Sequence, residues 1–358
     1  MSQYRVGVDI GGTFTDIVFL AEDGRIHTRK VSSTVDDYAQ AIVDGLAQVF
    51  EAEGLGGADI AELLHGTTVG SNAILELKGA RTGLITSEGF RDVLEIRTLR
   101  MPRLYDLHWE KPQPLIERYL RRGVTERISA DGVVQTPLDL DSAERAVQAL
   151  LDEKVEAIAV CLINSYANPE HEQAIADIIH AKAPDLPFCI SFDVLPEMKE
   201  YERTSTTVVN AYVKPATDAY LNRLNERMIA AGAASELLLM LSSGGVTTSA
   251  TAREFPVQII ESGPAAGALG AAHYAHLAGL DHVLAFDMGG TTAKLCLVNN
   301  GAVAKTTEFE VAHVHRFKTG SGIPVHVPVV DLMEIGAGGG SIARVTEAGT
   351  VQVGPESA

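Results

Sequence analysis

Apolar residues recur along the chain with two periods, one typical of amphipathic helices and one typical of buried strands. Helical spacing predicts helices over residues 37–53, 142–152, 169–183 and 197–229. The first stops at Gly54, and the last is broken at Pro215. Short β-prone runs predict strands at 6–8, 17–20, 82–86, 157–163, 237–241, 257–260, 283–286 and 295–298. This alternation indicates an α/β protein with a largely covered sheet.

An internal repeat is the most informative feature of the chain. The segment D-I-G-G-T-F-T-D runs from Asp9 to Asp16, and D-M-G-G-T-T-A-K runs from Asp287 to Lys294. Each copy lies between two β-prone runs, so each predicts a strand, a Gly-Gly turn and a second strand. An ordinary tight turn explains one copy equally well, but two copies in the same register argue against coincidence.

A Gly-Gly hairpin of this kind suits phosphate binding. Because glycine has no Cβ atom, the backbone N–H groups can approach a phosphate, and threonine hydroxyls add donors. An aspartate at the end of the first strand, here Asp9 or Asp287, can hold Mg²⁺ through water. Two such hairpins facing each other would grip a nucleoside triphosphate. The chain contains no G-x-x-x-x-G-K-[ST] loop, so the predicted device differs from a Walker loop.

Two further glycine-rich segments are candidate ligand loops. G-P-A-A-G from Gly263 follows a predicted strand, and Pro264 suits the first helical position. That segment is either an anion site at a helix N-terminus or an ordinary helix start. G-A-G-G-G-S from Gly336 is either a flexible loop or a cover for an adenine or ribose, formed by Gly338, Gly339 and Gly340.

A histidine and a group of arginines are weaker candidates. H-G-T-T begins at His65 and precedes a predicted helix over 69–78, with Thr67 or Thr68 available as its cap. His65 orients a substrate, carries a proton, or is a hydrogen-bonded core histidine. A solvated loop or a site for an anionic substrate explains the arginines Arg97, Arg100 and Arg103.

Composition narrows the class of protein. The 358 residues are 46% hydrophobic and 21% charged, as in a globular protein of two or three domains. Lys and Arg number 29 against 47 Asp and Glu, and the net charge of -18 argues against nucleic acid as a partner. No apolar run is long enough for a membrane span. The scattered cysteines indicate buried thiols in a reducing cytoplasm: Cys161, Cys189 and Cys296.

The repeat also predicts the domain organisation. We expect an N-terminal lobe over 1–195 with the first hairpin, connecting helices over 196–235, and the start of a second lobe over 236–358 with the second hairpin. Far fewer residues follow the second copy than the first. We therefore expect the second lobe to be incomplete in this chain.

These segments resemble the hydantoinase A/oxoprolinase family, which is part of the actin, sugar kinase and Hsp70-like ATPase superfamily. The resemblance covers the opening V-G-V-D-I-G-G-T-F-T-D, H-G-T-T-V-G-S-N-A from His65, G-F-R-D from Gly89 and S-G-P-A-A-G from Ser262. It continues through D-M-G-G-T-T from Asp287, S-G-I-P-V from Ser321 and E-I-G-A-G-G-G-S-I-A from Glu334. It therefore extends along nearly the whole chain.

The resemblance implies an ATP-binding A subunit with two RNase H-like lobes around a nucleotide cleft. Such a subunit works with a hydantoinase B-type subunit in a hetero-oligomer. Asp9 and Asp287 would position Mg²⁺ and ATP, and His65 is a further catalytic candidate. The candidates for binding phosphate and nucleotide are Gly11, Gly12, Thr13, Thr15, Gly289, Gly290, Thr291, Thr292, Lys294, Gly338, Gly339 and Gly340.

The reaction implied by the resemblance is the ATP-dependent opening of a cyclic amide, such as 5-oxoproline, a hydantoin or another lactam. Phosphorylation of the amide oxygen would activate the ring, and the B subunit would complete hydrolysis. The alternative is ATP-dependent carboxylation of a ketone such as acetone or acetophenone. A non-catalytic nucleotide-responsive module and a small-molecule kinase are further alternatives on the same fold.

The second copy of the repeat departs from the first at its end. Ala293 and Lys294 replace Thr15 and Asp16, so a hydroxyl and a carboxylate are lost and a cation is gained. Lys294 either contacts phosphate or balances a carboxylate.

Overall fold

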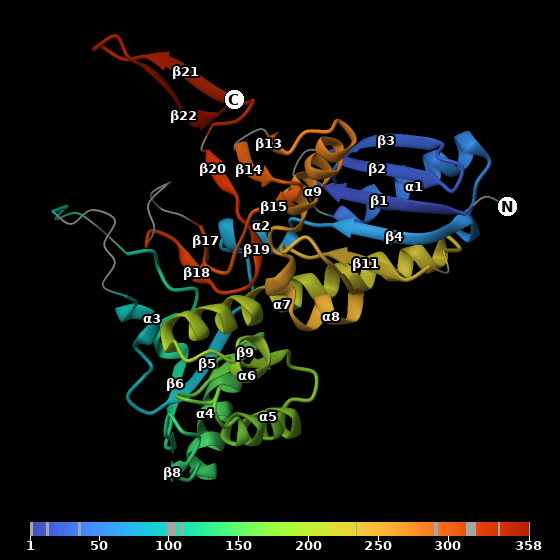
Figure 1. Cartoon of the computed structure of the whole chain (residues 1–358). Coiled ribbons are helices and arrows are strands. Elements are labelled where there is room, and N and C mark those ends of the chain that lie inside the picture. Colours follow the sequence, from blue (N-terminus) through green and yellow to red (C-terminus); the bar gives the residue numbers. More distant parts are fainter. Residues whose placement is uncertain are drawn as a thin grey trace.

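The computed structural model describes residues 3–11, 14–34, 37–98, 105–106, 108, 111–233, 235–289, 293–312, 320–335 and 337–357. Figure 1 shows a sheet of mainly blue strands, a green α/β unit below it, and orange and red strands that follow helix α9. Both copies of the repeat form the predicted pair of antiparallel strands.

The first sheet has six strands in the order β12-β11-β4-β1-β2-β3. The strands β1 to β3 form an antiparallel meander, while β4 and β11 run parallel to β1 and to each other. Helix α1 (Tyr38–Glu53) packs on one face and ends at Gly54 in the left-handed region, as predicted. The strand bounds are β1 Tyr4–Ile10, β2 Phe14–Ala21, β3 Ile26–Ser32, β4 Ile60–Gly66, β11 Leu237–Met240 and β12 Val246–Thr248.

The position of β11 differs from the expected start of the second lobe at residue 236. This strand pairs with β4 and therefore completes the sheet of the first hairpin (Figure 1). Pairing between strands so far apart in sequence leaves no local signal. The apolar run at 257–260 is also not a strand, because Pro256–Ile259 forms the 3₁₀ helix η3. Pro256 lacks the N–H that a strand ladder needs, and a short apolar run alone does not distinguish strand from buried helix.

The chain between β4 and β11 forms a second α/β unit with a parallel sheet in the order β10-β9-β5-β6. Its central strands β5 (Thr82–Ser87) and β9 (Ala157–Cys161) are buried along their whole length, as expected for a sheet covered on both faces. The flanking elements are β6 Arg121–Val124, β10 Phe188–Ile190, α4 Leu140–Asp152 and α5 Glu170–Lys182. The smaller ones are η1 Gly57–Asp59, α2 Val69–Leu75, α3 Val93–Ile96, η2 Arg118–Leu120, β7 Arg127–Ile128, β8 Val134–Thr136 and α6 Ser191–Val194.

Helix α7 (Glu200–Ala230) joins the cores of these two units. Val208 and Val209 pack in the core of the inserted unit, whereas Leu221 and Leu224 pack in the core of the first sheet. The predicted break at Pro215 does not occur, since the helix continues through this residue. Burial of both halves of α7 in two different cores holds the helix together despite the missing proline N–H.

Helix α9 (Ser262–Leu277) lies between the first sheet and the sheet of the second hairpin. Its small residues Ala265 and Ala268 pack against Cys296 and Val330. In the second sheet β13 (His282–Met288) pairs with β14 (Ala293–Asn299), whose other edge pairs with β15 (Ala302–Val303) and β20 (Met333–Ile335). The remaining elements are α8 Ser249–Glu254, β16 Lys305–Thr306, β17 Phe309–Val311, β18 Ile323–Val325, β19 Val329–Val330, β21 Ser341–Val345 and β22 Val351–Ser357.

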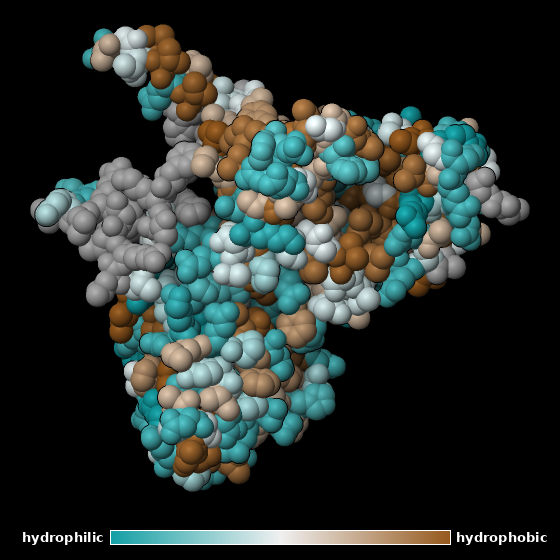
Figure 2. All heavy atoms as spheres, viewed as in Figure 1, coloured by the Kyte–Doolittle hydropathy of each residue, from teal (hydrophilic) through white to brown (hydrophobic). Residues whose placement is uncertain are grey.

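The two hairpins differ in the burial of their apolar face. Val8, Ile10 and Phe19 of the first hairpin are buried beneath helices. Their equivalents in the second copy of the repeat are 55% to 58% exposed: Phe286, Met288 and Leu297. Figure 2 accordingly shows brown, apolar surface near β14 and β20. No described element covers this face as α1 covers the first hairpin.

This difference predicts unequal costs for matched substitutions. Phe19→Ala removes a fully buried ring and should lower the free energy of unfolding by about 3–5 kcal/mol. Leu297→Ala, at the equivalent exposed position, should change it by no more than about 0.5 kcal/mol. Urea unfolding of both variants measures the difference. Similar losses in the two variants would contradict the asymmetry.

Candidate functional site

The first hairpin places Asp9 where negative charges converge. Burial is the main cause that raises the pKa of Asp9 to about 6, and the charges of Asp16 and Asp287 raise it further, while Lys30 opposes them. Asp9 and Asp16 are direct cross-strand partners, and the Nζ atom of Lys30 lies 2.7 Å from an Asp16 carboxylate oxygen. The charge of Asp287, from the second hairpin, thus acts on the Asp9 carboxylate of the first. The Asp9 side chain nevertheless remains accessible to solvent.

Two glycines bring backbone close to the Asp9 carboxylate. A Cβ atom added to Gly66, at the end of β4, would lie 3.2 Å from Oδ1 of Asp9. One added to Gly263, in the first turn of α9, would lie 3.1 Å from the same oxygen. A larger residue at either position would force this crowded carboxylate to move. The glycines therefore keep a narrow cradle around Asp9.

The H-G-T-T segment is locked to the start of α9. The N–H of Thr67 donates to Oγ of Ser262 at 2.9 Å, and this hydroxyl donates to the carbonyl of Thr67 at 3.0 Å. Helix α2 begins after Thr68, but it is the hydroxyl of Thr67 that accepts from the N–H of Val69. Pro264 is the third residue of α9 rather than the first, still within the turn where helix N–H groups lack helical acceptors.

Lys294 of the second hairpin forms an ion pair with Glu261, the residue that precedes α9. Its Nζ lies 2.5 Å from a carboxylate oxygen of Glu261. Burial alone would lower the pKa of Lys294, but Glu261, Glu334 and Asp287 together hold it above its ordinary value. Of the two roles predicted for Lys294, the structure therefore records the balancing of a carboxylate.

The third glycine-rich segment reaches the second hairpin. The N–H of Gly339 donates to the carbonyl of Gly289 at 2.9 Å, and the N–H of Gly338 donates to Oγ of Ser341. The predicted loop thus lies against the turn that carries the second D-x-G-G-T segment. Several predicted phosphate-binding residues lie outside the described residues, namely Gly12, Thr13, Gly290, Thr291 and Thr292.

Two predicted site residues are buried away from this cradle. The hydroxyl of Thr15 interacts with Oγ of Ser33, whose own hydroxyl donates to the carbonyl of Gly11. Thr15 is fully buried because it alternates with Asp16 along β2 and so faces α1. It therefore supports the hairpin from behind and does not face a ligand.

His65 is likewise a core residue. Its Nδ1 lies 3.3 Å from the carbonyl of Val8 and its Nε2 lies 2.7 Å from the hydroxyl of Tyr220. Complete burial lowers the pKa of His65 to about 4, so the imidazole is neutral at physiological pH. Both ring nitrogens have partners inside the protein, which supports the core-histidine interpretation over a proton carrier.

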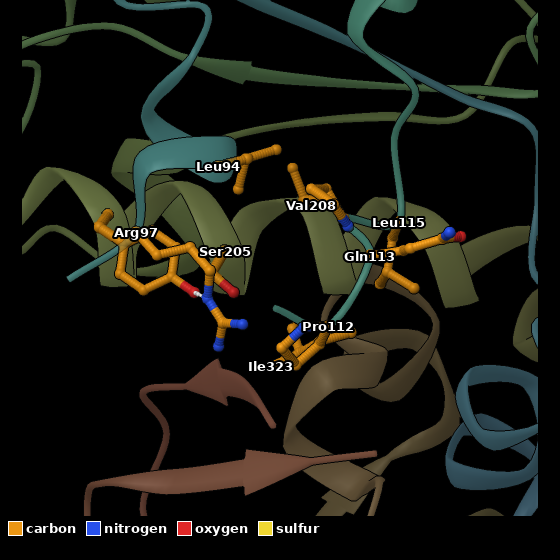
Figure 3. Close-up of a pocket in the computed structure, with 10 residues that line it drawn as sticks. Leu94, Arg97, Pro112, Gln113, Leu115, Ser205, Val208 and Ile323 are labelled. Carbon is orange, nitrogen blue, oxygen red and sulfur yellow. Dashed lines mark hydrogen bonds between the residues drawn. The ribbon is translucent and has the colours of Figure 1, made fainter. Parts of the chain in front are cut away.

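A pocket in the structure lies apart from the hairpins, around Arg97 (Figure 3). Nε of Arg97 donates to the hydroxyl of Tyr201 at 2.7 Å, and Nη2 donates to the carbonyl of Gly322. Leu94, Val208 and other apolar side chains line the pocket. Arg97 therefore connects α3, α7 and the segment before β18, and its Nε and Nη2 donors already have protein acceptors.

Metal-binding side chains are not grouped in threes anywhere among the described residues. No helix in the described ranges is long and apolar enough to cross a membrane.

Sequence reasoning missed Glu261 and the reciprocal bonding of Thr67 and Ser262. Glu261 directly precedes the S-G-P-A-A-G segment, but only the fold brings Lys294 beside it. A signal for Asp16 was present in the repeat, since it faces Asp9 across a two-strand hairpin.

The convergence of charge predicts a measurable change in Asp9. Asp16→Asn removes one negative charge and frees Lys30, so the pKa of Asp9 should fall below about 6 while burial keeps it above its ordinary value. Carboxyl ¹³C NMR titration measures this pKa. Asp23→Asn, at the exposed turn between β2 and β3, is the matched control and should leave it unchanged. An unchanged value in Asp16→Asn would contradict the coupling.

Two characterised relatives match nearly the whole of this chain. The 36% identical caprolactamase subunit alpha of Pseudomonas jessenii is matched over 99% of this chain, and the acetophenone carboxylase gamma subunit of Aromatoleum aromaticum is 33% identical over 99%. The chain covers 51% and 49% of these two proteins, respectively, and so spans about half their length.

Two solved structures also match nearly the whole of this chain and about half of their own length. The crystal structure of the ATP-dependent caprolactamase from Pseudomonas jessenii matches 99% of this chain and 51% of its own, with a TM-score of 0.85 and 36% identity. The nucleotide-free structure of acetone carboxylase matches 100% of this chain and 51% of its own, with a TM-score of 0.83 and 26% identity. These matches confirm the predicted α/β fold class with RNase H-like lobes.

The family models divide the chain close to the end of the inserted unit. The model described as hydantoinase/oxoprolinase N-terminal region matches residues 5–183, and the model described as hydantoinase/oxoprolinase matches residues 203–358. Together they include both hairpins, the Asp9 cradle and the Glu261–Lys294 pair. The chain therefore belongs to the hydantoinase/oxoprolinase family.

Proposed function

We propose that this chain is the ATP-binding part of an ATP-dependent enzyme that opens a cyclic amide. The observation that carries the proposal is that the start of α9 contacts both D-x-G-G-T hairpins, with Gly263 against Asp9 and Glu261 paired with Lys294. A nucleoside triphosphate carries several negative charges, so a site for it must supply cations and N–H donors. The described residues Lys30, Lys294 and Gly263 are suitably placed.

The residues around Asp9 fit a magnesium ion bound with the nucleotide. The charges of Asp16 and Asp287 act against ionisation of Asp9, and a divalent cation would relieve this repulsion. Asp9 and Asp287 are the residues that would hold Mg²⁺, directly or through water. When bound, the ion neutralises charge on the transferring phosphoryl group.

The proposed chemistry turns a poor electrophile into a reactive one. The amide oxygen forms a bond to the terminal phosphorus, the bond from that phosphorus to its bridging oxygen breaks, and ADP leaves. Water then adds to the activated ring carbon, and the C–N bond breaks as the ring nitrogen takes up a proton, which leaves an acyl phosphate. A second water cleaves the acyl phosphate and releases the carboxylate and phosphate. The role of the chain is to hold the triphosphate in line and to stabilise its charge through Lys294 and the hairpin N–H groups.

A ketone carboxylase is the second candidate, because relatives with that activity match the chain over the same length. In that reaction the enol oxygen of the ketone would take the place of the amide oxygen. We favour the amide branch because the caprolactamase subunit is the more similar of these characterised relatives.

We also propose that the chain acts with further polypeptide in the cytoplasm. The relatives are named as subunits, which supports a hetero-oligomer with a B-type partner. The exposed apolar face of the second hairpin supports the same view, since the equivalent face of the first hairpin is covered by helices. The described cysteines are free and buried, as in a reducing compartment.

Nucleotide binding is the direct test of the proposed site. Asp9→Asn should weaken binding of Mg²⁺–ATP by at least about tenfold, because the cation loses one of its carboxylates. Isothermal titration calorimetry on the assembled enzyme measures this loss. Asp23→Asn is a control carboxylate of the same sheet and should bind normally. Normal affinity in Asp9→Asn would refute the site.

Substrate conversion distinguishes the two branches. Given ATP and a lactam such as caprolactam, the assembled enzyme should release ADP and phosphate together with the ring-opened amino acid, measured by mass spectrometry. Given ATP, acetophenone and ¹⁴C-bicarbonate, it should incorporate no label into acid-stable product. Label incorporation without ring opening would establish the carboxylase branch instead.

A further inference from the structure

The two hairpins carry different rows of charge across their strands. Cross-strand pairing in the first sheet aligns an acid, an acid and a lysine, in the order Asp9, Asp16 and Lys30. The equivalent row of the second sheet aligns an acid, a lysine and an acid, in the order Asp287, Lys294 and Glu334. The central position thus carries a carboxylate in one copy and an ammonium in the other. The two halves of the cradle are therefore chemically unequal.

Glu261 adds a third carboxylate to the surroundings of Lys294. Its N–H donates to Oγ of Ser242 at 3.0 Å, which fixes the backbone just before α9. From there its carboxylate reaches Nζ of Lys294 at 2.5 Å, and the two side chains are only 13% and 20% exposed. The next residues of the chain are Ser262, bonded to Thr67, and Gly263, packed against Asp9. One short segment therefore contacts both hairpins.

This ion pair lies where an incoming phosphate would need a cation. Lys294 lies three residues after the second D-x-G-G-T segment in the sequence, and the N–H of Gly339 donates to the carbonyl of Gly289 within that segment. A lysine ammonium is a compact charge on a flexible stem with three donors, so it can exchange one oxyanion for another. A terminal phosphate offers more charge than one carboxylate and competes for the same donors.

We propose that Glu261 is a positioning residue that holds the Lys294 ammonium beside the second hairpin and releases it to the terminal phosphate when a nucleotide binds. We call this Glu261–Lys294 ion pair the latch. This inference rests on the proposed function, because it requires that the cradle bind a phosphorylated ligand. In the structure the Lys294 ammonium pairs with Glu261, while Asp287 and Glu334 are its cross-strand partners. On binding, the Lys294 ammonium leaves Glu261 and pairs with the terminal phosphate of the ligand.

The proposal predicts that removing the charge of Glu261 tightens nucleotide binding. Glu261→Gln removes a competitor for the ammonium, so the assembled enzyme should bind Mg²⁺–ATP roughly three- to tenfold more tightly in calorimetric titration, with a smaller gain for Mg²⁺–ADP. Lys294→Met should weaken ATP binding. The double variant should bind like Lys294→Met, because without the ammonium the loss of Glu261 has nothing to release.

Glu334→Gln is the matched control for this experiment. Glu334 also places negative charge beside Lys294, but it faces the lysine across the strands rather than forming the recorded ion pair. General relief of repulsion would tighten ATP binding equally in Glu334→Gln and Glu261→Gln. The latch proposal requires a clearly larger gain in Glu261→Gln.

The outcomes separate the inference from the proposed function. If the wild-type assembly binds no nucleotide, the proposed function fails. If it binds nucleotide but Glu261→Gln binds equally or more weakly, with thermal unfolding unchanged, the latch is overturned and the ion pair is only structural. If Glu261→Gln does not fold, Glu261→Asp shortens the side chain and keeps its charge, and it should still tighten ATP binding; weaker binding would overturn the latch.

Discussion

The structure depends on holding like-charged carboxylates close together at the junction of two sheets. Burial is the main reason that the pKa of Asp9 rises to about 6, and the negative charges of Asp16 and Asp287 raise it further. Only packing can bring them together, and α9 supplies it. Its alanines allow the second sheet to approach closely, and the bonds between Ser262 and Thr67 fix the start of the helix against the first sheet. Hydrophobic burial thus offsets the cost of a repulsive site.

The two hairpins differ in core size and in how they accommodate negative charge. The first hairpin is embedded in a complete core, with Phe19 beneath α1, and can bear the repulsion between Asp9 and Asp16. The second hairpin has a thinner core, in which Cys296 packs on α9, and Lys294 relieves the charge at the position equivalent to Asp16. Core size and charge balance therefore vary together between the two copies.

Local patterns in the sequence were sufficient for much of the fold and for part of the site. The repeat predicted both hairpins, and helical spacing predicted α1 with its end at Gly54, because these signals depend on neighbouring residues. The pairing of β11 with β4 and the continuation of α7 through Pro215 depend on contacts across the fold, which spacing does not encode. The Glu261–Lys294 pair was unpredictable for the same reason.

Strand alternation was the one local rule that could have corrected the site in advance. Thr15 belongs to the same face of β2 as the buried Ile17, so a hairpin that buries this face necessarily turns the Thr15 hydroxyl inward.

In the second copy of the repeat, the same alternation does not predict which side chains are buried. Leu297 belongs to the equivalent face of the second copy, yet it is exposed, and no described element covers that face. Since the relatives are about twice as long as this chain, the additional polypeptide in those proteins is large enough to supply that cover. Helix α9 packs on both sheets, so the packing of the second sheet and the surroundings of Asp9 depend on the same helix.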